Sequence, residues 1–365
     1  MLEIFVFLKH KLNASQWQKD NAAGLVADRT PYGYHLAEQH GCRLTFSKPH
    51  QEGCCLRFLR RLLRKLFQVD LIHAWRNREQ IFKSQVVWTH TEYEFLALLL
   101  LFRFCKPRPR PKLIGQSVWL ADHWHKLSSI KKFLYRKLTP SADVLTFHTQ
   151  QGLDKMQAIL KHPDCRLVKF GVSLESFPFQ KKALQTSQDG KIKIATLGND
   201  MHRDWSTFLS AFGKQKDFTV KIATSALNKS DVGYLGNIEV DLVRSIAGLQ
   251  ELYAWADLVV LPLRHNTHAS GLTVICEAIR CGTPVVCTDT GDLRTYFSDQ
   301  HICYVPPGSP DLIRQAAHSL ARDNKRCLDL VSNSQKLLKE EQISSEGFVL
   351  RHVEISRQLV SREGP

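Results

Sequence analysis

Short apolar runs alternate with helix-length segments along most of the chain. In the first 150 residues, β-branched and aromatic runs predict strands over residues 2–9, 43–48, 69–75, 85–92, 112–120 and 142–149. The segments between them predict helices over residues 31–41, 56–67 and 94–104, the first ended by Gly41. This alternation is typical of a parallel sheet with helices on both faces.

The same alternation restarts in the second half. Strands are predicted over residues 191–198, 218–225, 257–263 and 283–289, and helices over 204–212, 249–256 and 271–282. The intervening residues 180–191 are polar and aperiodic, which is typical of a linker. We therefore predict an α/β protein with two doubly wound, Rossmann-like domains at residues 1–172 and 173–345. Residues 346–365 are expected to form a C-terminal helix that crosses back to the N-terminal domain.

Composition restricts the class of protein. The chain of 365 residues is long enough for two domains, and 43% hydrophobic and 23% charged residues are ordinary for a globular protein. No apolar run approaches the roughly 20 residues of a membrane-spanning helix, and the N-terminus is read as a strand, not a signal peptide. The ten cysteines lack metal-type spacing, so we expect free thiols in a reducing cytoplasm.

The net charge of +15 is concentrated in the N-terminal half. In the helix predicted at 56–67, leucines occupy one face and basic residues the other, namely Arg57, Arg60, Arg61, Arg64 and Lys65. Such a helix either packs on its own sheet with a solvated basic side or also binds lipid phosphates, and both can hold. We predict peripheral association with the inner face of the plasma membrane. A basic nucleic-acid-binding protein is the alternative of another class, but no such motif is present.

The most informative segment is residues 268–292. A buried strand leads into a loop with Ser270 and Gly271, which opens a helix that Gly282 and Pro284 terminate. A helix N-terminus at the carboxyl end of a parallel strand binds anions through its free N–H groups. Glu277 is a lone carboxylate on this apolar helix. Either it accepts hydrogen bonds from ribose hydroxyls, or it faces solvent or caps a neighbouring loop, and the residues alone do not separate these alternatives.

These residues resemble glycosyltransferase family 4 and its GT-B relatives. The resemblance rests on Glu277-Ala278 followed by the segment 281–286 (CGTPVV), and on the segments 168–177, 194–212 and 249–263, which occur in the family's order. It implies two Rossmann-like domains facing across a cleft and a UDP- or GDP-sugar as donor. It also implies donor-binding roles for Gly198, Arg203, Ser270, Gly271, Leu272 and Glu277, with Arg203 neutralising the diphosphate and Glu277 holding the ribose. The alternative for Arg203 is an exposed residue paired with Asp204.

One position departs from the family pattern. Eight residues before Glu277, Ala269 stands where relatives usually carry an acid that contacts the donor sugar. Sugar recognition and the retaining or inverting outcome therefore stay open. An inverting, glucuronosyltransferase-like enzyme would need a general base, for which Asp122 is preferred and His90 and Glu92 are further candidates. His148 and Gln151 are candidates for lining the cleft, or have structural roles.

The resemblance thus predicts a hexosyltransferase that acts on a lipid-linked or polysaccharide acceptor in polysaccharide or glycolipid biosynthesis. No metal and no other cofactor is expected, because no DxD-like motif is present and Arg203 with helix N–H groups can meet the phosphates. The expected partners are the nucleotide-sugar donor, the acceptor and an anionic membrane surface, and nucleic acid is not expected.

Overall fold

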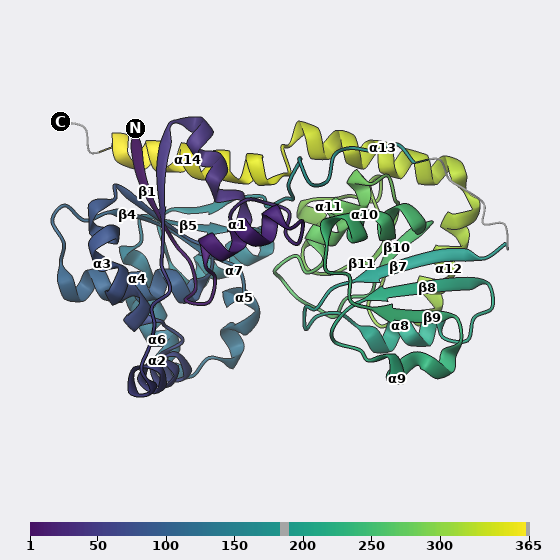
Figure 1. The fold of residues 1–365 in the computed structure, drawn as a ribbon, viewed down its shortest axis with the longest axis horizontal. Coiled ribbons are helices and arrows are strands. Elements are labelled where there is room, and N and C mark those ends of the chain that lie inside the picture. The colour runs from purple at the N-terminus through teal and green to yellow at the C-terminus, as the bar shows by residue number, and fades with distance from the viewer. Residues whose placement is uncertain (183–189, 363–365) are drawn as a thin grey trace. The chain divides into compact units, whose positions relative to one another are not determined.

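A computed structural model describes residues 1–182 and 190–362, so part of the predicted linker at 180–191 lies outside the described residues. The chain forms two compact units, drawn in Figure 1. Unit 1 contains Met1–Ala22, Asp28–Phe170 and the chain from Ser345 onward. Unit 2 contains Ala23–Ala27 and Gly171–Ser344. No helix in the described part of the chain is long and apolar enough to cross a membrane.

Unit 1 is built on a six-stranded parallel sheet in the order β2-β1-β3-β4-β5-β6. Its strands are β1 (Leu2–Phe7), β2 (Cys42–Phe46), β3 (Val86–Thr89), β4 (Lys112–Ser117), β5 (Val144–Phe147) and β6 (Cys165–Leu167). Its α-helices are α1 (Ala14–Ala22), α2 (Cys54–Phe67), α3 (Leu71–Lys83), α4 (Glu92–Cys105), α5 (Leu120–His123), α6 (Ser129–Leu138), α7 (Gln150–Leu160) and α14 (Ser345–Ser361). Three 3-10 helices are η1 (Pro31–His40), η2 (Trp124–Lys126) and η3 (Thr139–Ser141).

Unit 2 contains a second six-stranded parallel sheet in the order β12-β11-β10-β7-β8-β9. Its strands are β7 (Ile192–Leu197), β8 (Phe218–Ala223), β9 (Ile238–Asp241), β10 (Leu258–Leu261), β11 (Val285–Thr288) and β12 (Cys303–Val305). Its helices are α8 (Trp205–Phe212), α9 (Lys229–Val232), η4 (Gly233–Leu235), α10 (Ile246–Trp255), α11 (Leu272–Arg280), η5 (Leu293–Thr295), α12 (Pro310–Arg322) and α13 (Asn324–Glu340). The prediction of a doubly wound α/β fold is confirmed.

One local prediction was wrong and another was confirmed. Residues 69–75 were expected to form a strand, but helix α3 begins at Leu71 because the Asp70 carboxylate accepts a hydrogen bond from the backbone N–H of His73. The helix predicted over residues 31–41 is the 3-10 helix η1, and Gly41 ends it in a left-handed conformation (φ 74°), as the sequence indicated.

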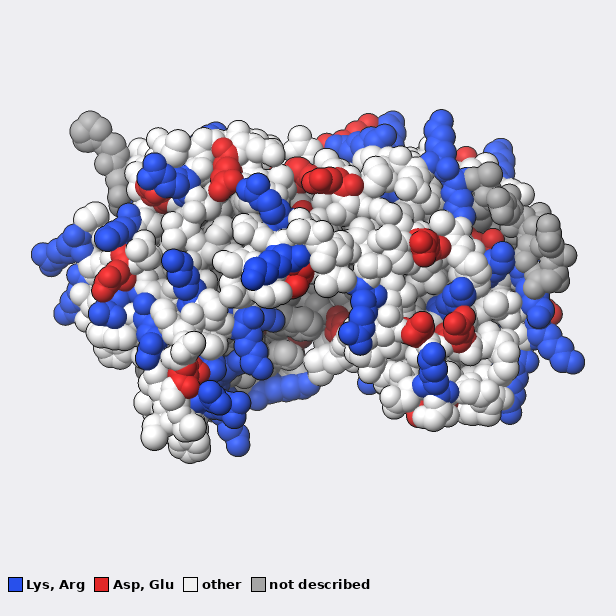
Figure 2. All heavy atoms as spheres, viewed as in Figure 1, with Lys and Arg blue, Asp and Glu red and all other residues white. Residues whose placement is uncertain are grey.

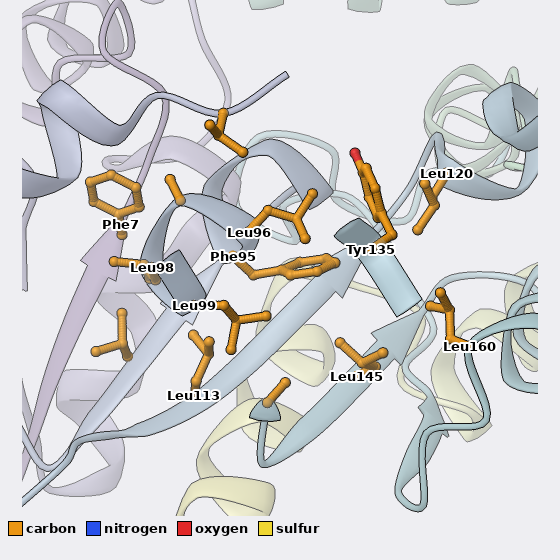
Figure 3. Packing of buried hydrophobic residues seen from close by; sticks show 14 of the residues in the cluster. Phe7, Phe95, Leu96, Leu98, Leu99, Leu113, Leu120, Tyr135, Leu145 and Leu160 are labelled. Atoms are coloured by element: carbon orange, nitrogen blue, oxygen red, sulfur yellow. The ribbon is translucent and has the colours of Figure 1, made fainter. Parts of the chain in front are cut away.

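Apolar side chains cover both faces of the unit 1 sheet. On one face, Phe95 of α4 lies over Leu113 and Leu145 of the strands (Figure 3). Helix α4 approaches β4 closely because Gly115 has no side chain, and a Cβ there would lie 3.0 Å from Phe95 and Leu145. On the other face, η1 and α14 pack on the strands, with Phe348 of α14 fully buried.

The strand order fixes where ligands bind. In a doubly wound sheet, the crevice lies at the carboxyl ends of the strands where the order reverses. That point lies between β1 and β3 in unit 1 and between β7 and β10 in unit 2. The loops that follow these four strands are therefore where functional side chains are expected.

Candidate functional site

The reversal point of unit 2 carries a buried arginine. Arg203 is 5% exposed; its Nε donates to the carbonyl of Leu197 (2.8 Å) and its Nη1 to Ser270 Oγ (2.8 Å). It lies against Gly198, whose φ is 124° and where a Cβ would lie 2.5 Å from the guanidinium. A guanidinium held this way at the ends of β7 and β10 is suited to binding an anion. The alternative that Arg203 is an exposed partner of Asp204 is excluded.

The loop before α11 contributes Ser270, Gly271 and Leu272, all buried. Gly271 adopts a left-handed conformation (φ 87°) and begins the helix. The N–H groups of Ser270 and Leu272 are engaged within the loop, donating to Asn266 Oδ1 (3.2 Å) and to the carbonyl of Ala269 (3.1 Å). The hydroxyl of Ser270 faces Arg203. The helix dipole still favours an anion here.

Glu277 lies on α11 and is largely buried. Tyr253 of α10 donates its hydroxyl hydrogen to Glu277 Oε2 (2.6 Å). Burial raises the pKa of Glu277 to about 7, although this hydrogen bond lowers it. The alternative that Glu277 faces solvent is therefore wrong. Tyr253 was not singled out from the sequence, since only the fold brings α10 beside α11.

A second carboxylate stands beside the position where relatives carry an acid. Asp200, in the loop after β7, accepts hydrogen bonds from Ser270 Oγ (2.6 Å) and lies 3.1 Å from His268 Nε2. Burial alone would raise the pKa of Asp200, but hydrogen bonds from His268 and Ser270 hold it well below its usual range. Ala269, next to Ser270, is buried with φ 55°. The loop after β7 therefore places an acid, Asp200, in contact with Ser270, the residue next to Ala269.

The reversal point of unit 1 holds a cavity of about 160 Å³. The cavity is lined by residues at the ends of β1 and β3, at the start of α4 and at the C-terminal end of α2. The lining residues include Lys9, Arg64, Thr91, Tyr93, Glu94 and Trp119. Burial raises the pKa of Glu94 to about 7, against the lowering effect of the hydrogen bonds from Thr91. Sequence reasoning did not single out Glu94, which in the structure forms a capping box with Thr91 at the start of α4.

The three candidate general bases are His90, Glu92 and Asp122. They are close in sequence to residues that line this cavity, but none of the three lines it. Glu92 is 1% exposed, and its Oε2 accepts the N–H groups of Val118 (3.2 Å) and Trp119 (3.3 Å), so it orders the turn after β4. His90 stacks on Tyr32 with ring centroids 3.2 Å apart, and burial holds the pKa of His90 well below its usual range. Asp122 is half-buried on the short helix α5.

The two cleft candidates at the end of β5 differ in exposure. His148 is buried, with Nδ1 3.0 Å from the carbonyl of Val168. Gln151 is exposed in the first turn of α7. His148 therefore has a structural contact within unit 1.

Comparison with known proteins identifies the class of reaction that the protein catalyses. Residues 194–323, which contain the Arg203, Ser270 and Glu277 sites, match the family model described as "Glycosyl transferases group 1". The chain is a glycosyltransferase. No curated protein matches the sequence. Membership of family 4 in particular stays a prediction.

Solved structures confirm the GT-B fold of this glycosyltransferase. Sucrose-phosphate synthase from Thermosynechococcus elongatus has a TM-score of 0.75 at 13% identity, with 99% of this chain and 100% of that chain covered. HepE from Anabaena, in complex with UDP and glucose, has a TM-score of 0.67 at 12% identity, covering 98% and 100%. Trehalose 6-phosphate synthase from Burkholderia multivorans has a TM-score of 0.71 at 9% identity, covering 100% and 99%.

Proposed function

We propose that this glycosyltransferase transfers a sugar from a UDP-sugar to a lipid-linked or polysaccharide acceptor at the cytoplasmic face of a membrane. The observation that carries the donor assignment is the anion site at the reversal point of unit 2, where Arg203 is buried between Gly198 and Ser270. A leaving nucleotide diphosphate gains charge as the glycosidic bond breaks, and a preorganised guanidinium stabilises that charge. The choice of UDP is supported by HepE, which binds UDP-glucose.

The ribose is assigned to Glu277. A ribose hydroxyl donates a hydrogen bond best to the ionised carboxylate, and Tyr253 already occupies Oε2. Since the pKa of Glu277 is about 7 without a nucleotide, binding of ribose hydroxyls favours the charged form. The nucleotide therefore lies along α11, with its diphosphate toward the helix N-terminus.

The acceptor is assigned to the cavity of unit 1. It offers the aromatic rings of Tyr93 and Trp119 for a sugar face, cationic groups for phosphate, and the Glu94 carboxyl. A general base with a pKa near 7 is well matched to accepting a hydroxyl proton, so Glu94 joins Asp122 as a candidate base for an inverting reaction. Arg64 of α2 is part of the wall, which connects acceptor binding to the basic helix.

Membrane binding is assigned to α2. The basic side chains of Arg57, Arg61, Arg64 and Lys65 are exposed, and so are the apolar side chains of Phe58, Leu59, Leu62, Leu66 and Phe67. Figure 2 shows blue and white spheres together over the part of unit 1 where Figure 1 labels α2 and α6. A helix with an exposed apolar side beside a cationic side is typical of one that lies in the plane of an anionic membrane.

The donor proposal is tested with a panel of nucleotides in a thermal-shift assay and by calorimetry. UDP and a UDP-sugar are expected to raise the melting temperature, because a ligand that binds only the folded state stabilises it. Arg203→Gln should weaken UDP binding at least tenfold, while Arg294→Gln, which changes an exposed arginine of unit 2, should leave it unchanged. If GDP stabilises the protein and UDP does not, the assignment of UDP as the nucleotide of the donor is wrong. If no nucleoside diphosphate binds, the donor site is wrong.

A further inference from the structure

Helix α6 of unit 1 exposes two large apolar side chains to solvent. Ile130 is 72% exposed and Phe133 is 63% exposed. The helix itself is well anchored. Ser128 Oγ accepts a hydrogen bond at its start (3.4 Å), and the fully buried Tyr135 lies in the core that contains Phe95 of α4 (Figure 3). The exposed side chains therefore project from an ordered helix whose opposite side is packed on unit 1.

The exposed side of α6 is also positively charged. Arg136 and Lys137 come three and four residues after Phe133, so they project from the same side of the helix. Lys137 Nζ lies 5.7 Å from the centre of the Phe133 ring. Neither cation forms an ion pair with any residue that the structure describes, and residues 123–142 contain five lysines and arginines but no acid. Helix α6 therefore presents apolar groups beside cations that the protein does not neutralise.

This combination of groups selects one kind of partner. A symmetric dimer formed through α6 would place identical cations against each other, and like charges repel. A nucleic acid would bind the cations but would leave Ile130 and Phe133 in water. An anionic bilayer accommodates both kinds of side chain, because its phosphates attract the cations while the apolar groups enter the boundary between headgroups and acyl chains.

We propose that α6 is a second membrane-binding helix, which inserts Ile130 and Phe133 into the interface of an anionic bilayer. This proposal rests on the membrane function proposed for α2 and adds a separate point of attachment, since α2 packs on α3 whereas α6 packs on α4. Arg64 of α2 and Tyr93 of α4 both line the acceptor cavity. Attachment through both helices restricts the orientation of unit 1 and keeps that cavity close to the lipid surface.

Two points of attachment on one unit make membrane binding multivalent. Once one helix is bound, the other meets the bilayer at a high effective concentration, so the two contributions multiply. Loss of either helix's contribution should therefore weaken binding, and loss of both should abolish it. Binding should also require anionic lipid and weaken as salt screens the cations.

Co-sedimentation of the full-length protein with vesicles of phosphatidylglycerol and phosphatidylcholine tests α6. Ile130→Ser with Phe133→Ser should weaken binding at least tenfold, because apolar area no longer leaves water. The matched control is Leu312→Ser with Leu328→Ser, which changes exposed leucines of unit 2 and should have no effect. Both variants should keep the wild-type UDP affinity, which shows that they fold. An α6 variant that binds vesicles as tightly as the wild type overturns the proposal.

Insertion of the helix is measured directly with Phe133→Trp. Brominated anionic lipids should quench its fluorescence more strongly than that of the wild type, which has seven tryptophans, and Leu328→Trp should show no such increase. Absence of extra quenching in Phe133→Trp contradicts insertion of α6.

The outcomes separate the α6 proposal from the membrane function on which it rests. If the wild type does not bind anionic vesicles at low salt, the membrane function of α2 is wrong, and α6 has no bilayer to enter. If charge reversal on α2 abolishes binding while both α6 measurements match the wild type, only the α6 proposal is wrong. A dimer that Ile130→Ser with Phe133→Ser dissociates, in a protein that ignores vesicles, would assign this side of α6 to a second copy instead.

Discussion

A buried carboxylate with a pKa near neutrality makes the donor site sensitive to pH. Burial raises the pKa of Glu277 to about 7, and Tyr253 is the hydrogen-bond donor to it. The folded pKa lies above that of an unfolded glutamate. Protonated Glu277 therefore stabilises the fold below about pH 4.5 relative to high pH, and this contribution is lost as the pH rises toward 7.

The substitution Glu277→Gln tests whether the Glu277 carboxylate contributes to UDP binding. It should weaken UDP binding by roughly 1.5–3 kcal/mol at pH 8, because a hydrogen bond to a charged group is lost. It should also make the affinity for a UDP-sugar, whose esterified diphosphate does not titrate in this range, nearly independent of pH between 6 and 8, where the wild type binds more tightly as Glu277 ionises. Calorimetry across this range measures both effects. Wild-type affinity that does not change with pH would show that ribose does not contact this carboxylate.

The same residues show what a sequence can and cannot predict. Gly198, Arg203, Ser270 and Glu277 could be named as candidates because each belongs to a motif that is continuous along the chain, and the fold brings the first three into contact. Asp200 and His268 were missed as a pair, since they are 68 residues apart. They meet because β7 and β10 are neighbours in the sheet, and the strand order is not written in any local pattern.

At the scale of the element, helix α2 forms as predicted, but the side chains that it buries and exposes differ from the prediction. Its periodicity correctly indicated an amphipathic helix, but Arg60 is 7% exposed and forms ion pairs with Glu52 (2.6 Å) and Asp70 (3.2 Å). Arg60 therefore does not belong to the exposed basic side. Phe58, at 69% exposure, and Leu62 are exposed instead of packed in a core. Periodicity shows that a helix has two faces, but not which one meets the protein.

Charge reversal on α2 tests membrane binding. Arg57, Arg61 and Lys65 are exposed and lie outside the acceptor cavity. Changing all three to glutamate should reduce partitioning onto anionic vesicles at least 100-fold, because each basic residue contributes about 1 kcal/mol near such a surface. Co-sedimentation measures this. The control makes the same charge change at Lys325, Arg326 and Lys336, which are exposed on α13 of unit 2.

The apolar side of α2 is tested separately. Phe58→Ser with Leu62→Ser should weaken vesicle binding at high salt, where the electrostatic attraction is screened, without changing UDP affinity. If wild-type protein does not bind anionic vesicles at low salt, α2 has another role. If it binds RNA in a filter assay and the arginine variants do not, the nucleic-acid alternative returns.

At the scale of the whole molecule, the last helix belongs to the first unit. Helix α14 follows the whole of unit 2 in sequence, yet Ser356 Oγ accepts a hydrogen bond from Trp88 Nε1 of β3 (2.8 Å). Phe348 packs among Tyr34, Phe170 and His352, with ring centroids 4.4–5.8 Å away. The apolar positions of residues 345–361 predict a helix, but their partners lie about 180–310 residues earlier in the chain, which only the folded structure reveals.

Paired substitutions test whether the two units unfold separately. Phe348→Ala in unit 1 and Phe212→Ala in unit 2 each remove a fully buried ring, which typically costs about 3–5 kcal/mol. Hydrogen exchange should rise in β1, β3 and β4 for the first variant and in β7 and β8 for the second, because each substitution lowers the opening free energy of its own core. Calorimetry should find UDP affinity unchanged in Phe348→Ala, since the donor site lies in unit 2. Equal increases in exchange in both sheets with either variant would mean that the two units unfold as one cooperative structure.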